Sequence, residues 1–346
     1  MRTGVFHESF ASEQTLWESP TTRVWMLAFT VALFSLPLWG GDYVLAIACI
    51  VGIHVVATLG LNLTTGNAGL ISLSHGAFLG VGCYTVAWLG KHGVPFYITL
   101  PVAGFVSAFL GVIVGLPSLR VKGLYLAIAT LAAHFILTFV FREWDWATGG
   151  VSGTSIPRAN LFGFQFIGDG RNFYLIFACA FVMAIAARNL GRTHIGRALV
   201  AVRDRDISAE ILGVHLLRTK LLAFAVGAFY AGVAGGLLGY FYGNITPDYF
   251  VLTLSVFYLA AVIVGGLGTV LGSVLGAAFM TFVPELLRLL AQASSGWFPG
   301  IAGLLLPMGQ VVFGLLIIVF LIFEPHGLAA VWARVRRSFH LWPFRT

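Results

Sequence analysis

Hydrophobic residues gather along this chain into long runs that short polar segments separate. Runs of roughly 17–25 apolar residues are long enough to cross a bilayer as helices, and in lipid each backbone group must find its partner within the segment. The pattern therefore predicts an all-α fold, a polytopic transmembrane helix bundle. About ten spans are expected, at residues 24–40, 43–61, 68–90, 96–117, 123–141, 172–187, 221–243, 251–267, 269–289 and 301–323.

The composition agrees with a membrane protein. Of the 346 residues 59% are hydrophobic and 10% are charged, whereas a soluble domain carries about 25% charged residues. The 42 glycines fit as well, because small residues let transmembrane helices approach closely. We expect a polar N-terminal tail over 1–22 that is not a cleaved signal peptide, a transmembrane domain over 23–330, and a basic C-terminal tail over 331–346.

Positive charge is distributed unevenly between the two sides of the predicted bundle. With both termini on one side, that side holds 15 of the 20 Lys and Arg residues. Cytoplasmic loops are enriched in these residues, so we expect both termini to be cytoplasmic. Orientation thus explains the net charge of +7 better than nucleic-acid binding does. Residues 142–171 form the longest predicted extracytoplasmic loop, which is either a connector or a docking surface.

Nine of the 33 charged residues lie between Gly191 and Lys220, on the predicted cytoplasmic side. Thr193 is a suitable N-cap for a short amphipathic helix whose apolar face holds Leu199 and Val202. Asp206 or Ser208 then caps a second helix, and Gly213 suits its left-handed C-terminal position. We interpret this segment, called here the charged element, as a protein-docking element rather than a solvated loop.

Two glycine-rich stretches stand out within the apolar runs. The first would break or thin a helix, and broken membrane helices commonly line substrate sites. Its small residues also allow close helix packing, which we favour, with some pathway lining. This motif contains Gly66, Asn67, Gly69, Ser72, Ser74, His75 and Gly76. The second stretch predicts small-residue packing by Gly265, Gly266, Gly268, Gly272 and Gly276.

Several chemistries are missing from the sequence. No GxxxxGK[ST], HExxH or GxSxG motif occurs, so we expect no catalytic residues, no metal site and no ATP site in this chain. Cys49, Cys83 and Cys179 are isolated and are interpreted as buried small hydrophobes. The mid-membrane stretches are nearly free of charge, which argues against an ion-coupled carrier. A relay through His54, His75 or His134 is the alternative that would allow ion coupling.

The stretch GNAGLISLSHGAF, Gly66 to Phe78, resembles the signature of LivM-type permeases, the transmembrane subunits of branched-chain amino acid ABC importers. Residues 244–250, 262–277 and 323–328 resemble further parts of that family. The charged element resembles its cytoplasmic loop through Gly196, Arg197, Arg203, Asp204, Ala209, Leu212 and Gly213. The resemblance covers about residues 40–330, in five matches that follow the family's order.

The resemblance implies an importer subunit in the bacterial inner membrane that moves solute by alternating access. Its implied partners are a second, related permease chain, two cytoplasmic ATPase subunits that bind ATP and Mg, and an extracytoplasmic binding protein. The charged element would then be the helix pair that couples to the ATPase, through Arg197, Arg203, Asp204, Arg205, Asp206, Ala209, Glu210 and Gly213. A urea or short-amide permease, a stand-alone secondary carrier and a non-transporting membrane scaffold are the alternatives.

Overall fold

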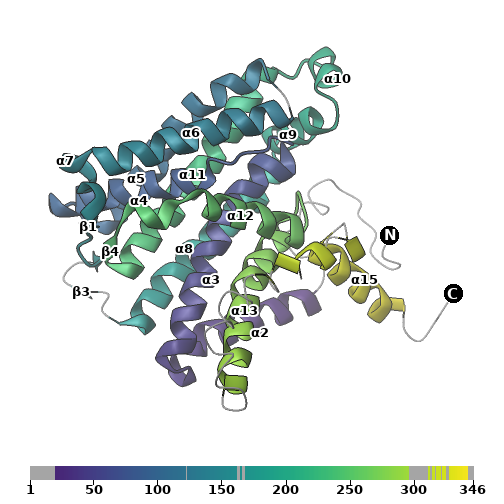
Figure 1. The fold of residues 1–346 in the computed structure, drawn as a ribbon. Helices are drawn as coiled ribbons and strands as arrows, with labels where there is room; N and C mark the ends of the chain where they lie inside the picture. Colours follow the sequence, from purple (N-terminus) through teal and green to yellow (C-terminus); the bar gives the residue numbers. More distant parts are fainter. Residues whose placement is uncertain are drawn as a thin grey trace.

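The computed structural model describes residues 20–121, 123–161, 164–165, 168–295 and 327–341, with positions 311, 314–315, 317–320 and 322–324 between them. In this part of the chain the protein is a bundle of α-helices (Figure 1). Among the described residues, six helical segments are long and apolar enough to cross a membrane. They are Asp42–Asn67, Phe96–Gly115, Leu124–Glu143, Gly170–Arg192, Leu216–Tyr242 and Val270–Leu289. The prediction of an all-α membrane protein is confirmed.

The centre of the bundle is formed by four helices. Helix α11 (Leu216–Tyr242) packs against α3 (Asp42–Leu61), α4 (His75–Lys91) and α5 (Phe96–Gly115). Close approach depends on glycine: a methyl group at Gly235 of α11 would overlap the carbonyl of Leu79, and one at Gly82 of α4 would overlap that of Gly232. Small residues therefore set the spacing of the core helices, as is typical of membrane bundles.

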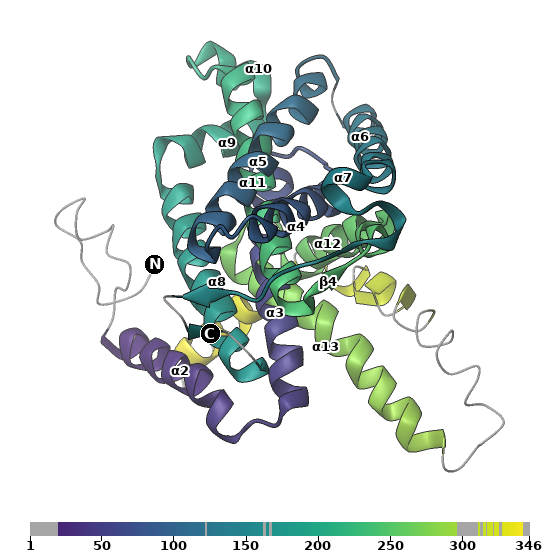
Figure 2. The same cartoon turned by 90° about the vertical axis from the view of Figure 1, so that its left-hand side faces the viewer.

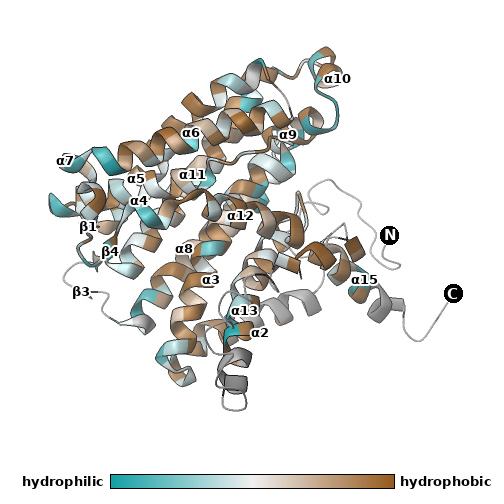
Figure 3. Ribbon diagram, in the orientation of Figure 1, coloured by the Kyte–Doolittle hydropathy of each residue, from teal (hydrophilic) through white to brown (hydrophobic). Residues whose placement is uncertain are grey.

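The remaining helices cover this centre. α6 (Leu124–Glu143), α8 (Asp169–Arg192), α12 (Leu252–Gly265) and α13 (Val270–Ser295) surround it, while α2 (Pro20–Trp39) and α15 (Leu328–Leu341) lie at its periphery (Figures 1 and 2). Hydrophobic residues run along these helices (Figure 3). Large apolar side chains are exposed on them, among them Phe105 and Phe109 on α5, Phe139 on α6 and Phe282 on α13. An apolar surface this extensive requires lipid or a partner chain.

Short elements gather at the two ends of the bundle. One end carries α9 (His194–Asp204), α10 (Asp206–Ile211), the 3₁₀ turn η2 (Leu116–Leu119) and the π-helix η1 (Asn62–Asn67). At the opposite end lie α7 (Asp145–Thr148), the 3₁₀ turns η3 (Gly150–Ser152) and η4 (Pro247–Phe250), and strands β1 (Thr154–Ser155) and β4 (Asn244–Ile245) (Figure 1). β1 pairs antiparallel with β4, and β2 (Asn160–Leu161) pairs antiparallel with β3 (Phe164–Gln165).

One predicted span has a wrong start, and another lies mostly outside the described residues. The span expected at 68–90 is wrong at its start, because α4 begins at His75 and the preceding span continues through η1 to Asn67. Gly69 has a φ of 69°, a left-handed conformation that ends a right-handed helix. Most of the span expected at 301–323 falls outside the described residues, as does most of the N-terminal tail.

Candidate functional site

A helix break separates α3 from α4. The chain passes from η1 through a non-helical segment, 68–74, before α4 begins. In this segment the side chains of Ala68 and Leu70 are buried against α6, α9 and α11, and the amide of Leu73 donates to Oγ1 of Thr130 over 3.0 Å. Irregular backbone inside a membrane protein needs such cover by protein or water. The glycine motif thus forms a break at one end of the bundle that protein covers in part, with Gly69 and Ile71 exposed.

Polar contacts hold the start of α4 in place. Nε2 of His75 lies 2.8 Å from the carbonyl oxygen of Ala57, and the amide of Gly76 donates to Oγ of Ser255 over 2.8 Å. Ser72 and Ser74 share a hydrogen bond of 3.1 Å. His54 lies 2.8 Å from the hydroxyl of Tyr258, and Nδ1 of His134 lies 3.4 Å from Oγ of Ser255. Each of the three histidines has one ring nitrogen with a hydrogen-bond partner, as structural histidines commonly do. Nε2 of His134, however, is buried and has no partner among the described residues.

Asn62, which the sequence analysis did not single out, joins the break to the turn between α12 and α13. Its Nδ2 donates to the carbonyl of Thr269 and to Oγ of Ser273, each over 2.8 Å, and its Oδ1 accepts from the amide of Gly268 over 2.8 Å. Asn62 is 4% exposed. A buried amide must find partners, so an Asn within an apolar run was the available signal.

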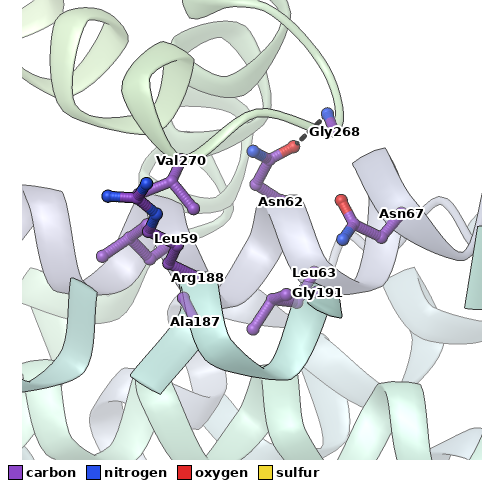
Figure 4. Close-up of a pocket in the computed structure, with 9 residues that line it drawn as sticks. All are labelled: Leu59, Asn62, Leu63, Asn67, Ala187, Arg188, Gly191, Gly268 and Val270. Carbon is purple, nitrogen blue, oxygen red and sulfur yellow. Dashed lines mark hydrogen bonds between the residues drawn. The ribbon is translucent and has the colours of Figure 1, made fainter. Parts of the chain in front are cut away.

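A pocket of about 190 Å³ lies beside this contact. Asn62, Asn67 and Gly268 line one side of it and Ala187, Arg188 and Gly191 of α8 line the other (Figure 4). Leu59, Leu63 and Val270 complete its aliphatic wall. The pocket therefore joins three segments that are distant in the sequence, at the end of the bundle that carries α9 and α10.

The glycines of both stretches lie where backbones approach. A methyl group at Gly66 would overlap Oδ1 of Asn62 and lie 2.5 Å from the amide nitrogen of Gly268, and one at Gly76 would lie 2.9 Å from Oγ of Ser255. Methyl groups at Gly265, Gly272 and Gly276 would press on α12, α13 or the turn between them. Gly266 and Gly268 have φ values of 119° and 77° in this turn. These positions favour packing for the residues of the two stretches, while Gly69 is exposed and Asn67 borders the pocket.

The charged element folds as two helices. Oγ1 of Thr193 accepts from the amide of Gly196 at the start of α9 (3.3 Å), which confirms the expected cap. Leu199 and Val202 are buried, as the apolar face predicted. The expected N-cap of α10 is wrong in position, because the N-cap is Arg205, whose backbone is extended. Oδ1 of Asp206 nevertheless accepts from the amide of Ile207 in the first turn over 3.0 Å. Gly213 follows α10 with a φ of 89°, the conformation that glycine adopts most easily.

The residues proposed for ATPase coupling have different environments. Ala209 is buried, and Oδ2 of Asp206 lies 3.9 Å from Nζ of the buried Lys220 on α11. These two residues therefore anchor α10 to the bundle. The exposed members are Arg197, Arg203, Asp204, Arg205, Glu210 and Gly213.

An apolar tip on α10 was not predicted from the sequence. Ile207, Ile211 and Leu212 are 68%, 81% and 83% exposed, and α10 projects beyond the other helices in both views (Figures 1 and 2). Exposed apolar residues with charged neighbours are typical of protein contact sites. The spacing of four between Ile207 and Ile211 was the signal available in the sequence.

One side chain connects the charged element to the glycine motif. Nη1 of Arg203, near the end of α9, donates to the carbonyl oxygen of Gly66 over 2.7 Å. No sequence pattern links the two features, because Gly66 and Arg203 are 137 positions apart. The structure brings them into one site together with the turn between α12 and α13.

These features define a multi-pass α-helical membrane protein with a helix break and two short amphipathic helices at one end. Residues 43–321 match the family described as branched-chain amino acid transport system / permease component. The chain belongs to this family, and it is a component of a transport system.

Three relatives show the range of the similarity. The chain is 32% identical to the high-affinity branched-chain amino acid transport system permease protein LivM of Salmonella typhimurium and 31% identical to LivM of Escherichia coli, each over 88% of this chain and 74% of the relative. It is 28% identical to the probable branched-chain amino acid transport permease protein LivH of Methanocaldococcus jannaschii, over 82% of this chain and 90% of the relative. No solved structure gives a significant match.

Proposed function

We propose that this protein is the permease subunit of an ATP-driven importer for branched-chain amino acids. The observation that carries the proposal is the charged element, whose anchored α10 presents the apolar tip of Ile207, Ile211 and Leu212 away from the bundle. A permease without an ATP site of its own needs such a contact for separate ATPase subunits, which would hold ATP and Mg. The LivM and LivH relatives support the permease role.

The charge distribution supports a cytoplasmic position for this end of the bundle. Arg120, Arg188, Arg192, Arg203 and Arg218 belong to it, whereas Lys91, Arg142 and Arg158 belong to the end that carries β1 and β4. Cytoplasmic loops are the ones enriched in Lys and Arg. We therefore propose cytoplasmic termini, about ten spans and a bacterial inner-membrane location, with residues 142–171 outside.

The partners follow from the same proposal. LivM-like and LivH-like permeases are both similar to this chain, which supports a heterodimer of two related permeases. β1 pairs with β4 at the end of the bundle that this proposal places outside, and the guanidinium of Arg142 lies 3.1 Å from Oδ1 of Asp248 nearby. This ordered outer surface suits an extracytoplasmic binding protein. Closure of the ATPases would push on α10 and rock the helices, so that the pathway opens to alternate sides.

Transport by the reconstituted complex tests the proposal. Proteoliposomes containing this chain, its paired permease and the two ATPases, supplied with the binding protein, should take up radiolabelled leucine only with ATP. Mg-ATP replaced by Mg-ADP is the control for energy coupling. Leucine uptake by the purified chain alone would indicate a stand-alone carrier, and ATP-driven uptake of urea but not of leucine would indicate the short-amide alternative.

A further inference from the structure

Arg203 lies where three segments of the site meet. Its Nη1 donates to the carbonyl of Gly66 over 2.7 Å, and a methyl group at Gly268 would lie 3.1 Å from the same nitrogen. Its aliphatic stem packs on Gly69, where a methyl group would lie 3.1 Å from Cγ of Arg203. One side chain thus contacts the π-helix, the segment after it and the turn between α12 and α13.

The contact between Arg203 and Gly66 places a cation at the C-terminal end of a helix, where it is favourable. Gly66 lies in η1, the last part of the continuous helical span Asp42–Asn67. The last carbonyls of a helix lack partners in the helix and form its negative end, where a cation is favourable. A guanidinium that donates to such a carbonyl combines a charge-assisted hydrogen bond with this dipole interaction.

The contact also reaches beyond η1. Because Asn62 binds Gly268, Thr269 and Ser273 through its amide, the end of the α3 span and the start of α13 are held together. A force on Arg203 is therefore applied both to the end of the α3 span and to the start of α13. The main chain connects Arg203 to α10 through two residues, Asp204 and Arg205.

We propose that Arg203 is the positioning residue that transmits movement of α9 and α10 to the helix break and to the turn between α12 and α13. This role rests on the proposed function, because it requires that movement of the ATPases reaches the permease at α10. Arg203 then passes this movement to the helix break. Arg203 itself does not bind the ATPase in this role. Its loss uncouples transport from ATP hydrolysis while the complex stays assembled.

The test compares Arg203→Ala with Arg120→Ala in the full complex. Arg120, directly after η2 at the same end of the bundle, is also an exposed arginine and lies outside the charged element. We expect Arg203→Ala to retain the ATPases and to hydrolyse ATP within about twofold of wild type, while solute imported per ATP falls about tenfold, the effect that one charged hydrogen bond carries. Arg203→Lys should recover part of this loss, and Arg120→Ala should resemble wild type. Unchanged coupling in Arg203→Ala, or loss of the ATPases from it, would overturn the proposal.

Hydrogen exchange gives a readout that needs no knowledge of the solute. In the purified chain, Arg203→Ala should speed amide exchange in peptides covering 62–69 and 266–273, and Arg120→Ala should not. Equal exchange in both variants would show that Arg203 does not hold these segments. If wild-type complex imports no leucine while the exchange difference is present, the proposed substrate fails and the contact stands.

Discussion

At the scale of single residues, the site depends on the small space around Gly66. The side chain of Asn62 fills that space from one side and the amide of Gly268 from the other. Oδ1 of Asn62 and the amide of Gly268 also bind each other over 2.8 Å. A larger residue at position 66 must therefore displace a hydrogen-bonded pair and not only a flexible side chain.

The variant Gly66→Ala tests whether Gly66 serves helix packing or lines the solute pathway. We expect the variant to lose about 1–3 kcal/mol of stability, the usual cost of overpacking a closely packed site, seen as a lower melting temperature in detergent. Gly41→Ala is the matched control, because nothing lies within 4 Å of a methyl group there. A Gly66→Ala variant that melts like wild type but no longer imports solute would instead show that Gly66 lines the pathway.

At the scale of elements, the charged element acts through the division between its anchored and exposed faces. Leu199, Val202 and Ala209 are buried, and Asp206 lies beside Lys220, so α9 and α10 are fixed to the bundle. Ile207, Ile211 and Leu212 point away from it. A fixed base with an apolar tip is suited to receive force from a partner.

The double variant Ile211→Asp, Leu212→Asp tests this division. Burial of a carboxylate in an apolar contact is unfavourable, so we expect co-purification of the ATPases to fall about tenfold or more, as for a central interface residue. The control is Leu116→Asp, which places one such carboxylate at an exposed apolar position in η2, outside the charged element but at the same end of the bundle. If ATPase binding survives the double change, the docking surface lies elsewhere.

The sequence was sufficient for features that depend on near neighbours. The cap at Thr193, the buried face with Leu199 and the turn at Gly213 each follow from residues within one or two helical turns, and the structure contains them. The contacts of Asn62 with Gly268 and of Arg203 with Gly66 join positions 206 and 137 residues apart. No local pattern encodes such pairs. The start of α4 was missed for the same reason, because Ser255 and Thr130 fix it from other helices.

At the scale of the whole molecule, the two ends of the bundle differ in charge and in the elements they carry. α9, α10 and the pocket lie at one end, and the paired strands β1 and β4 lie at the other (Figure 1). The single helix α8 connects residues 142–165 to the charged element. Residues flanking α8 must therefore be on opposite sides of the membrane if α8 spans it.

Single cysteines on the two ends test this orientation. Val151 and Ser208 are both exposed, and Cys49, Cys83 and Cys179 are replaced by alanine to provide the background. In intact spheroplasts a membrane-impermeant thiol reagent should label Val151→Cys and leave Ser208→Cys unlabelled, with the reverse in inverted vesicles. The predicted spans 24–40, 43–61, 68–90, 96–117, 123–141 and 172–187 separate Ser12 from Ser208. Their even number puts the two residues on the same side, so Ser12→Cys should label like Ser208→Cys. Labelling of Ser208→Cys from outside would reverse the orientation and remove α10 from the reach of a cytoplasmic ATPase.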